Sequence, residues 1–299
     1  MRIALLATTV ALSFLCPPAA AGAGGKLLLT GGVTTIDGAA GGGLTPWALV
    51  GSYAAGGQWG ATATLSRAAT QDYGLTVAGA ALAWGDRVEL SLARQDFDLR
   101  DNLAPLGLTG LRLKMDVLGA KWRLGGNAVL DADTWMPQLA VGLLHKRVDA
   151  GALADTLTGP LGAKDQGTEA YLSATKLFLA PGLLLNATLR ATNANQGGLL
   201  GFGGAQSRGV RLQPEVSVGW LWRRDVAVGV EYRVKPDHLN RSVLGDGALK
   251  EDDWWDVFIA WAPSKHVSVT AAWVDLGRIA PAVQPRRQTG AYLSTQFAF

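Results

Sequence analysis

Apolar and polar residues alternate with a period of two along most of this chain. In the clearest segment, 210–222, Val, Leu, Pro and Trp occupy one face, while mostly polar and charged residues occupy the other. A helix would scatter these apolar residues around its circumference, whereas a strand places them all on one side. The pattern therefore predicts β-strands. The predicted strands are 26–35, 46–54, 58–67, 73–84, 87–97, 111–123, 134–147, 168–179, 183–193, 209–222, 225–235, 252–262, 265–275 and 289–299.

The connections between the predicted strands fall into short and long ones that mostly alternate along the chain. Outer-membrane barrels show this alternation, because short periplasmic turns and long extracellular loops join their strands. The sequence therefore predicts an all-β fold, an antiparallel up-and-down transmembrane β-barrel of about 12–14 strands. The count falls to about twelve if the first strand, 26–35, lies outside the wall, since an even number is usual. A β-bulge is expected near 94–97, where the alternation slips.

A soluble β-sandwich or a periplasmic lipocalin-like barrel would also alternate. Neither would place so many Val, Leu and Trp side chains on its outer face while Arg, Glu and Lys face inward. Composition also favours the membrane barrel, because 48% of the residues are apolar and 17% are charged, against about 25% charged in a typical soluble domain. Beyond the N-terminal region no run of about 18 apolar residues occurs, so the sequence contains no candidate transmembrane helix.

Tryptophan is enriched where membrane proteins cross the two bilayer interfaces. Most of the 11 Trp residues fall near the ends of predicted strands, and this position indicates interface girdles. The predicted girdle residues are Trp84, Trp122, Trp220, Trp222, Trp254, Trp255, Trp261 and Trp273.

Both ends of the chain carry features of an exported outer-membrane protein. Residues 1–23 read as a cleaved secretory signal peptide, with an apolar stretch and a small-residue cleavage pattern before Gly24. Residues 24–299 are then expected to form a single barrel domain. The last strand ends on Phe297 and Phe299 and resembles the C-terminal signal by which outer-membrane barrels are recognised for insertion. The expected location is the cell outer membrane, with its lipid bilayer and the barrel-assembly machinery as partners.

Composition excludes several classes of function. The only cysteine, Cys16, lies in the predicted signal peptide, so disulfides, thiol catalysis and cysteine metal sites are excluded for the exported part. Lys and Arg number 27 against 24 Asp and Glu and form no run, so nucleic acid is not an expected partner. The glycine-rich block 38–43 has no following Lys-Ser/Thr and no helix for a phosphate to cap, so neither a nucleotide nor any cofactor is expected. If the loop 36–45 folds into the lumen, it would narrow the pore.

Six short segments carry a further signal. They are 25–33 (GKLLLTGGV), 36–47 (IDGAAGGGLTPW), 87–91 (RVELS), 260–266 (AWAPSKH), 274–277 (VDLG) and 292–294 (YLS). Together they resemble a proteobacterial family of exported proteins of unknown function, of the outer-membrane β-barrel type. The resemblance runs over nearly the whole exported chain, and the glycine-rich N-terminal block is its most specific part. It implies location and fold, and it implies no activity.

The inward-facing residues of the predicted strands carry charges of both signs, with bases in excess. Two interpretations stay open. The charges pair across strands and fill the interior, or they line a water-filled pore with a mild preference for anions. The predicted lumen-lining residues are Arg87, Glu89, Arg112, Lys114, Asp116, Arg190, Arg211, Glu215, Glu231, Arg233 and Lys235.

One pair of residues raises the question of catalysis. His266 and Ser268 stand two positions apart on a predicted strand, as in the His-x-Ser pair of an outer-membrane lipid A deacylase family. A catalytic serine needs a base within hydrogen-bond reach, but His266 is expected at a periplasmic turn, away from the outer leaflet. No catalytic residue and no metal site is therefore predicted. The leading hypothesis is a passive or selective channel for small polar or anionic solutes. The alternatives are a non-conducting structural or partner-binding barrel and, third, an envelope lipid-modifying enzyme.

Overall fold

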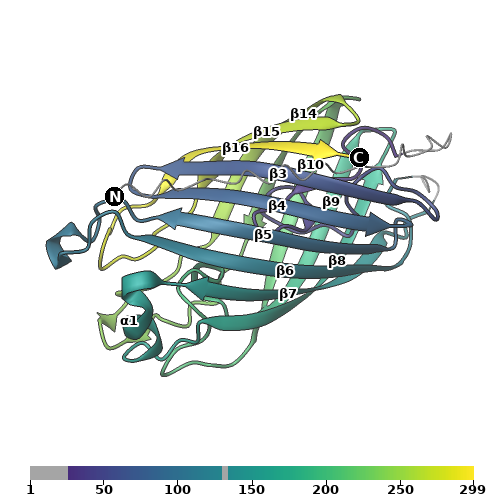
Figure 1. The fold of residues 1–299 in the computed structure, drawn as a ribbon. Coiled ribbons are helices and arrows are strands. Elements are labelled where there is room, and N and C mark those ends of the chain that lie inside the picture. The colour runs from purple at the N-terminus through teal and green to yellow at the C-terminus, as the bar shows by residue number, and fades with distance from the viewer. Residues whose placement is uncertain (1–25, 130–133) are drawn as a thin grey trace, which may run out of the picture.

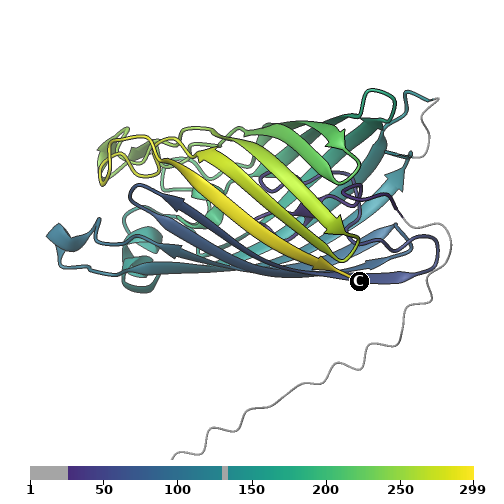
Figure 2. The ribbon, with the colours of Figure 1, turned by 90° about the horizontal axis from the view of Figure 1, so that it is seen from above.

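The computed structural model describes residues 26–129 and 134–299, so the predicted signal peptide lies outside the described residues. Within those ranges, twelve antiparallel strands close into one barrel, shown from two sides in Figures 1 and 2. Each strand pairs with the next along the chain, and the last strand pairs with the first. The predicted fold class is confirmed, with the smaller of the expected strand numbers. The wall strands are β3 (Trp59–Thr70), β4 (Gly74–Trp84), β5 (Val88–Asp98), β6 (Arg112–Gly125), β7 (Gln138–Asp149), β8 (Gln166–Phe178), β9 (Leu183–Thr192), β10 (Arg211–Arg223), β11 (Val226–Arg233), β14 (Trp254–Ser264), β15 (Val267–Asp275) and β16 (Thr289–Ala298).

The two ends of the barrel differ in the length of their connections, and we call them the loop end and the turn end. The loop end carries the short connection 71–73 and the long loops 99–111, 150–165, 193–210, 234–253 and 276–288. The turn end carries 85–87, 126–137, 179–182, 224–225 and 265–266. Small elements fold within the loops, namely η1 (Ala104–Leu106), η2 (Gly151–Leu153), α1 (Ala154–Thr158), η3 (Asn195–Gly198), β12 (Arg241–Ser242) and β13 (Gly245–Asp246). No helix in the described ranges is long and apolar enough to span a membrane.

The first two predicted strands, 26–35 and 46–54, do not belong to the wall. Residues 26–54, called the plug below, run inside the barrel, where the purple segment is visible in both views (Figures 1 and 2). The plug contains one short hairpin, in which β1 (Val33–Thr34) pairs with β2 (Ala40–Gly41). Every residue from 37 to 52 is buried. The prediction failed because a wall strand exposes one face to lipid, whereas this glycine-rich segment is covered on all sides by the wall.

The predicted bulge near 94–97 is also absent from the described wall. Strands β4, β5 and β6 pair without a register shift along the whole of β5. The alternation only seemed to slip because the polarity of the two faces inverts along the strand. Toward the turn end, Leu90 and Leu92 are exposed on the outer face, whereas toward the loop end Arg94 points outward and Phe97 is buried inside.

The same inversion continues through the neighbouring strands β6 and β7. On β6, Leu118 and Trp122 are exposed on the outer face, as expected for a lipid-facing surface. Beyond them toward the loop end, the outward side chains are charged and pair across strands, as in Arg94 with Asp116 at 3.4 Å. Because charged side chains are costly in hydrocarbon, this part of the wall rises above the lipid band.

Candidate functional site

Ionisable side chains from β5 through β11 and from β14 point into the barrel. Each is less than 10% exposed, so the interior of the barrel contains many buried charged groups beside its apolar clusters. They are Glu89, Lys121, Lys146, Glu169, Arg190, Glu215, Glu231, Arg233, Asp256 and, just beyond β11, Lys235.

The structure places six of the predicted lumen-lining residues inside the barrel. They are Glu89, Arg190, Glu215, Glu231, Arg233 and Lys235. Sequence reasoning missed Lys121, Lys146, Glu169 and Asp256. The parity of neighbouring residues could have identified Lys121, because Ala120 and Trp122 on either side of it point outward. The role of these residues as a pore lining stays a prediction.

The other predicted lumen-lining residues lie elsewhere. Arg112, Lys114 and Asp116 are exposed on the outer face of β6, while Leu113, Met115 and Val117 between them are buried inside. That prediction took the apolar face for the lipid face, which is wrong where the wall rises above the lipid band. Arg87 is exposed in the turn 85–87. Arg211 lies at the loop end, where its Nη1 donates to the Pro236 carbonyl at 2.6 Å.

Asp37, in the turn of the β1–β2 hairpin, lies among three basic side chains of the wall. Its Oδ1 is 2.9 Å from Lys146 Nζ. Its Oδ2 is 3.5 Å from both Arg190 Nη1 and Arg233 Nη2. Asp37 is the only acidic residue of the plug, so the plug presents its single negative charge to the most basic part of the wall.

The three bases belong to a run of alternating charges across five adjacent strands, which we call the inner ion ladder. Its members are Lys146 on β7, Glu169 on β8, Arg190 on β9, Glu215 on β10 and Arg233 on β11. Successive members are joined by ion pairs of 2.7, 3.2, 2.5 and 3.2 Å. Three bases and two acids leave one positive charge, which Asp37 balances. This balance matters because a buried charge without a partner is strongly destabilising.

Glu231 forms a second contact between wall and plug. Its carboxylate accepts hydrogen bonds from the backbone N–H groups of Leu44 at 2.7 Å and Thr45 at 3.3 Å, and from the Thr45 hydroxyl at 2.5 Å. The hydroxyl of Ser217 donates to the same carboxylate and accepts a bond from the indole N–H of Trp47. Gly42 allows this approach, because a Cβ there would lie 2.3 Å from Glu231 Oε1.

Glu89 and Lys121 hold the plug from the opposite side of the ring of strands. The two side chains form an ion pair of 3.2 Å and are each 1% exposed. Glu89 also accepts from the N–H groups of Ala40 and Gly51, and Lys121 donates to the carbonyls of Ala40 and Leu49. One buried pair therefore satisfies four backbone groups of the plug.

Wall hydroxyls and amides satisfy further backbone groups of the plug. The Pro46 carbonyl accepts from Thr188 at 2.7 Å and Ser173 at 3.2 Å. The Ala48 carbonyl accepts from Gln138, and the Ala48 N–H donates to Thr175. These bonds replace the strand pairing that the plug lacks, since buried backbone groups need partners.

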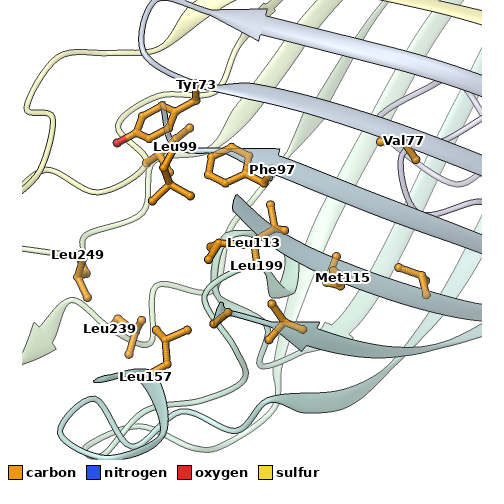
Figure 3. Packing of buried hydrophobic residues seen from close by; sticks show 14 of the residues in the cluster. Tyr73, Val77, Phe97, Leu99, Leu113, Met115, Leu157, Leu199, Leu239 and Leu249 are labelled. Atoms are coloured by element: carbon orange, nitrogen blue, oxygen red, sulfur yellow. The ribbon is translucent and has the colours of Figure 1, made fainter. Parts of the chain in front are cut away.

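The loop end is closed by apolar side chains from the wall and the loops, which we call the outer cluster (Figure 3). Leu113 and Met115 of β6 meet residues of distant loops such as Leu157, Leu199 and Leu239. Two ion pairs link the loops at their edges. Arg278 binds Asp252 with two bonds of 2.8 Å, and Arg286 Nε donates to Asp72 at 2.6 Å.

Residues 30–296 match the model of a family described as protein of unknown function (DUF3034). The chain belongs to this family. The resemblance stated from sequence is therefore confirmed. No curated protein matches the chain by sequence.

Solved structures with a similar fold include porins. A rhombohedral crystal form of the NanC porin gives a TM-score of 0.51 at 8% identity, over 79% of this chain and 98% of that chain. The KdgM porin in complex with disordered oligogalacturonate gives 0.50 at 9% identity, over 80% and 99%. At these identities the likeness shows the fold alone. Outer membrane phospholipase A from Escherichia coli, at a TM-score of 0.43, 8% identity and coverage of 79% and 92%, is too distant to inform about activity.

The other candidate residues of this DUF3034 protein have local partners. His266 Nδ1 is 2.9 Å from the Ala298 carbonyl, and no hydrogen bond joins His266 to Ser268 among the described residues. Trp254 does not belong to a girdle, because it is 6% exposed and lies beneath Lys235 Nζ at 3.8 Å from its ring. Trp84, Trp122, Trp220, Trp222 and Trp261 lie toward the turn end, while Trp255 and Trp273 lie toward the loop end. Phe297 and Phe299 are exposed.

The interior of the barrel leaves little free space. A cavity of about 30 Å³ remains between plug and wall, lined by residues that include Leu29, Trp47, Leu177 and Phe258. This volume is about that of a single water molecule, so it is too small for a sugar or an amino acid. No group of three or more His, Cys, Asp or Glu in the described ranges is arranged to hold a metal ion. In the structure, the interior of the barrel is therefore occupied by the plug.

Proposed function

We propose that this protein is an outer-membrane channel for small polar solutes that its plug holds closed. The observation that carries the proposal is the polar interface between plug and wall. The wall contributes charged groups, hydroxyls and amides, and the plug contributes mainly backbone N–H and C=O groups. Water can replace each partner when the plug moves, so separation costs less than exposing an apolar interface of the same area.

Apolar contacts give the closed state its advantage. Leu29, Val33, Trp47 and Leu49 of the plug pack against Leu177 and other wall residues toward the turn end. Burial of such side chains stabilises the closed state by about 1.5–3 kcal/mol each. We therefore expect the wild-type protein to be closed most of the time and to open rarely.

The second candidate is a non-conducting barrel that presents its loops to a partner. The outer cluster favours it, because the buried side chains that form it all come from the wall and the loops. This candidate predicts that the barrel stays silent even when the plug is released.

A reversible disulfide separates the two candidates. The side-chain oxygens of Thr45 and Ser217 are 2.5 Å apart, so Thr45→Cys with Ser217→Cys brings two thiols within bonding range. In a chain beginning at Gly24 these are the only cysteines. Single-channel conductance in planar bilayers is measured before and after reduction. The single variant Ser217→Cys is the control.

We expect the oxidised double variant to be silent and the reduced form to open more often than wild type, since it also lacks the hydroxyls that bind Glu231. The control should be insensitive to reductant. An inserted, folded double variant that stays silent after reduction at every voltage overturns the channel proposal in favour of the second candidate.

A further inference from the structure

The site that binds Asp37 has features of a ligand site on the wall. Its three bases come from three different strands, and each is buried to 4% exposure or less. Within the ladder they are held by Glu169 and Glu215, which belong to the wall and stay when the plug leaves. The site is therefore built by the barrel, and the plug only fills it.

The two carboxylate oxygens of Asp37 lie at unequal distances from the bases. Oδ1 is 2.9 Å from Lys146 Nζ, a normal charge-assisted contact. Oδ2 lies 3.5 Å from two guanidinium groups and makes no hydrogen bond. The hairpin turn that carries Asp37 fixes its reach, whereas an untethered carboxylate would approach both arginines at about 2.7–2.9 Å.

Charge decides which anion suits the site. With Asp37 absent, the inner ion ladder keeps one net positive charge, so one negative charge restores balance. The guanidinium group of arginine matches the geometry of both carboxylate and phosphate, so shape does not distinguish the two anions. A phosphate monoester brings about −1.5 to −2 charges and would leave the buried site negative. A single carboxylate is the better match.

We propose that Lys146, Arg190 and Arg233 form the solute site of the barrel, that its solutes carry a carboxylate, and that Asp37 occupies the site as an internal substitute for them. This inference rests on the proposed channel function. Solute and plug then compete for the same three bases, so a carboxylate-bearing solute favours the open state.

The binding test does not depend on conductance. Asp37→Asn leaves the site in place with a neutral occupant. Thermal unfolding of the refolded variant is followed with D-gluconate, which carries one carboxylate, and with D-glucose, its neutral counterpart, at constant ionic strength. We expect gluconate to raise the melting temperature of Asp37→Asn and to act at an about tenfold lower concentration than on wild type. Glucose should have no effect on either protein.

Two further variants define the site. Asp37→Asn with Arg233→Gln removes the net charge and should abolish the gluconate effect. Asp86→Asn breaks the ion pair of Lys26 with Asp86, so it loosens the plug away from the site and should not create gluconate binding. Equal effects of gluconate and glucose, or an unchanged gluconate effect in the double variant, overturn the inference.

Conductance then separates the two proposals. If the reduced disulfide variant conducts and gluconate blocks its current no better than glucose does, the channel stands and the carboxylate site fails. If every variant is silent while gluconate still stabilises Asp37→Asn, the site stands and the channel fails. An inorganic phosphate that stabilises the variant better than gluconate overturns the choice of carboxylate.

Discussion

At the scale of single residues, the buried charges of this barrel serve two partners at once. Glu89 and Lys121 pair with each other and also bind backbone groups of the plug. A buried ion pair adds little to stability by itself, because desolvation offsets the attraction between the charges. The loss of one partner is costly, however, because the other stays buried and charged. The main effect of the pair is therefore to fix the position of the plug.

The cost of a lone buried charge predicts the result of Lys121→Met. The variant leaves Glu89 buried without its cation, so we expect a loss of about 3–5 kcal/mol in unfolding free energy. Urea unfolding in lipid vesicles measures it. The exposed pair of Arg94 and Asp116 provides the control, and Arg94→Gln should cost less than about 1 kcal/mol. Similar losses in the two variants would contradict the assignment of Lys121 to the interior.

A single glycine sets how closely the plug approaches Glu231. In Gly42→Ala the new Cβ would meet the Glu231 carboxylate at 2.3 Å, so plug or carboxylate must shift. We expect the open fraction in planar bilayers to rise several-fold, which corresponds to about 1 kcal/mol of lost plug binding. Gly56→Ala is the matched control, since nothing lies within 4 Å of a Cβ there. Equal open fractions in both variants would show that this contact does not hold the plug.

At the scale of elements, β6 is one strand with two environments. Toward the turn end its outer face is apolar, and toward the loop end the same face carries Arg112, Lys114 and Asp116. Its inner face changes in the opposite sense, from Lys121 to Met115 and Leu113 in the outer cluster. The strand thus passes from lipid to water on the outside and from an ionic to an apolar filling on the inside.

Cysteine labelling tests this inversion directly. In the chain beginning at Gly24, Lys114→Cys should react rapidly with a membrane-impermeant maleimide applied to intact vesicles or cells. Met115→Cys, one residue further along and 1% exposed, should react at least tenfold more slowly. Equal rates for the two positions would mean that the loop end of β6 is not packed against the outer cluster.

The sequence was sufficient to predict the strands of the wall, but not which residues fill the lumen. Period-two alternation located all twelve wall strands within a few residues, because that period follows from strand geometry alone. It could not tell which face meets lipid, and it therefore misplaced Lys114 and its neighbours. It also predicted strands at 26–35 and 46–54, where the structure has the plug, with one short hairpin and otherwise irregular backbone. The partners of Asp37 lie more than 100 positions away and become neighbours only when the barrel closes.

At the scale of the whole molecule, the lumen is closed twice by different chemistry. The plug is held by many polar contacts in addition to its apolar packing, whereas the loop end is closed by apolar packing. Ion pairs at the edges join the loops, with Asp252 bound to Arg278 and Asp72 bound to Arg286. In the proposed channel a solute passes both closures, so loop motion and plug motion are separate steps.

The loop ion pairs predict a response to acid. Hydrogen bonds from Arg278 lower the pKa of Asp252 to about 2, and those from Arg286 lower the pKa of Asp72. Asp252 therefore stabilises the folded loops above about pH 4, and this contribution is lost as the pH falls toward about 2. Asp72 acts in the same direction. We expect hydrogen exchange of 234–253 and 276–288, corrected for intrinsic rates, to stay constant between pH 7 and 5 and to rise below pH 4.

Asp252→Asn provides the comparison for this response. It should raise exchange in these loops already at pH 7 and leave a weaker change below pH 4. Loss of protection between pH 7 and 5 in the parent protein would point to other titrating groups.

The way the plug is held also bears on how the molecule is assembled. The plug precedes all the wall strands in the sequence, so it is synthesised before them. Its hydrogen-bond partners are nevertheless spread from β5 to β11, and Thr34 donates a hydrogen bond to Gln296 on the last strand. No incomplete set of strands offers the whole site, so the plug can settle only after β16 has joined β3 and closed the ring. Contacts that span so much sequence form slowly. We therefore expect the plug to settle, and water to leave the lumen, late in folding.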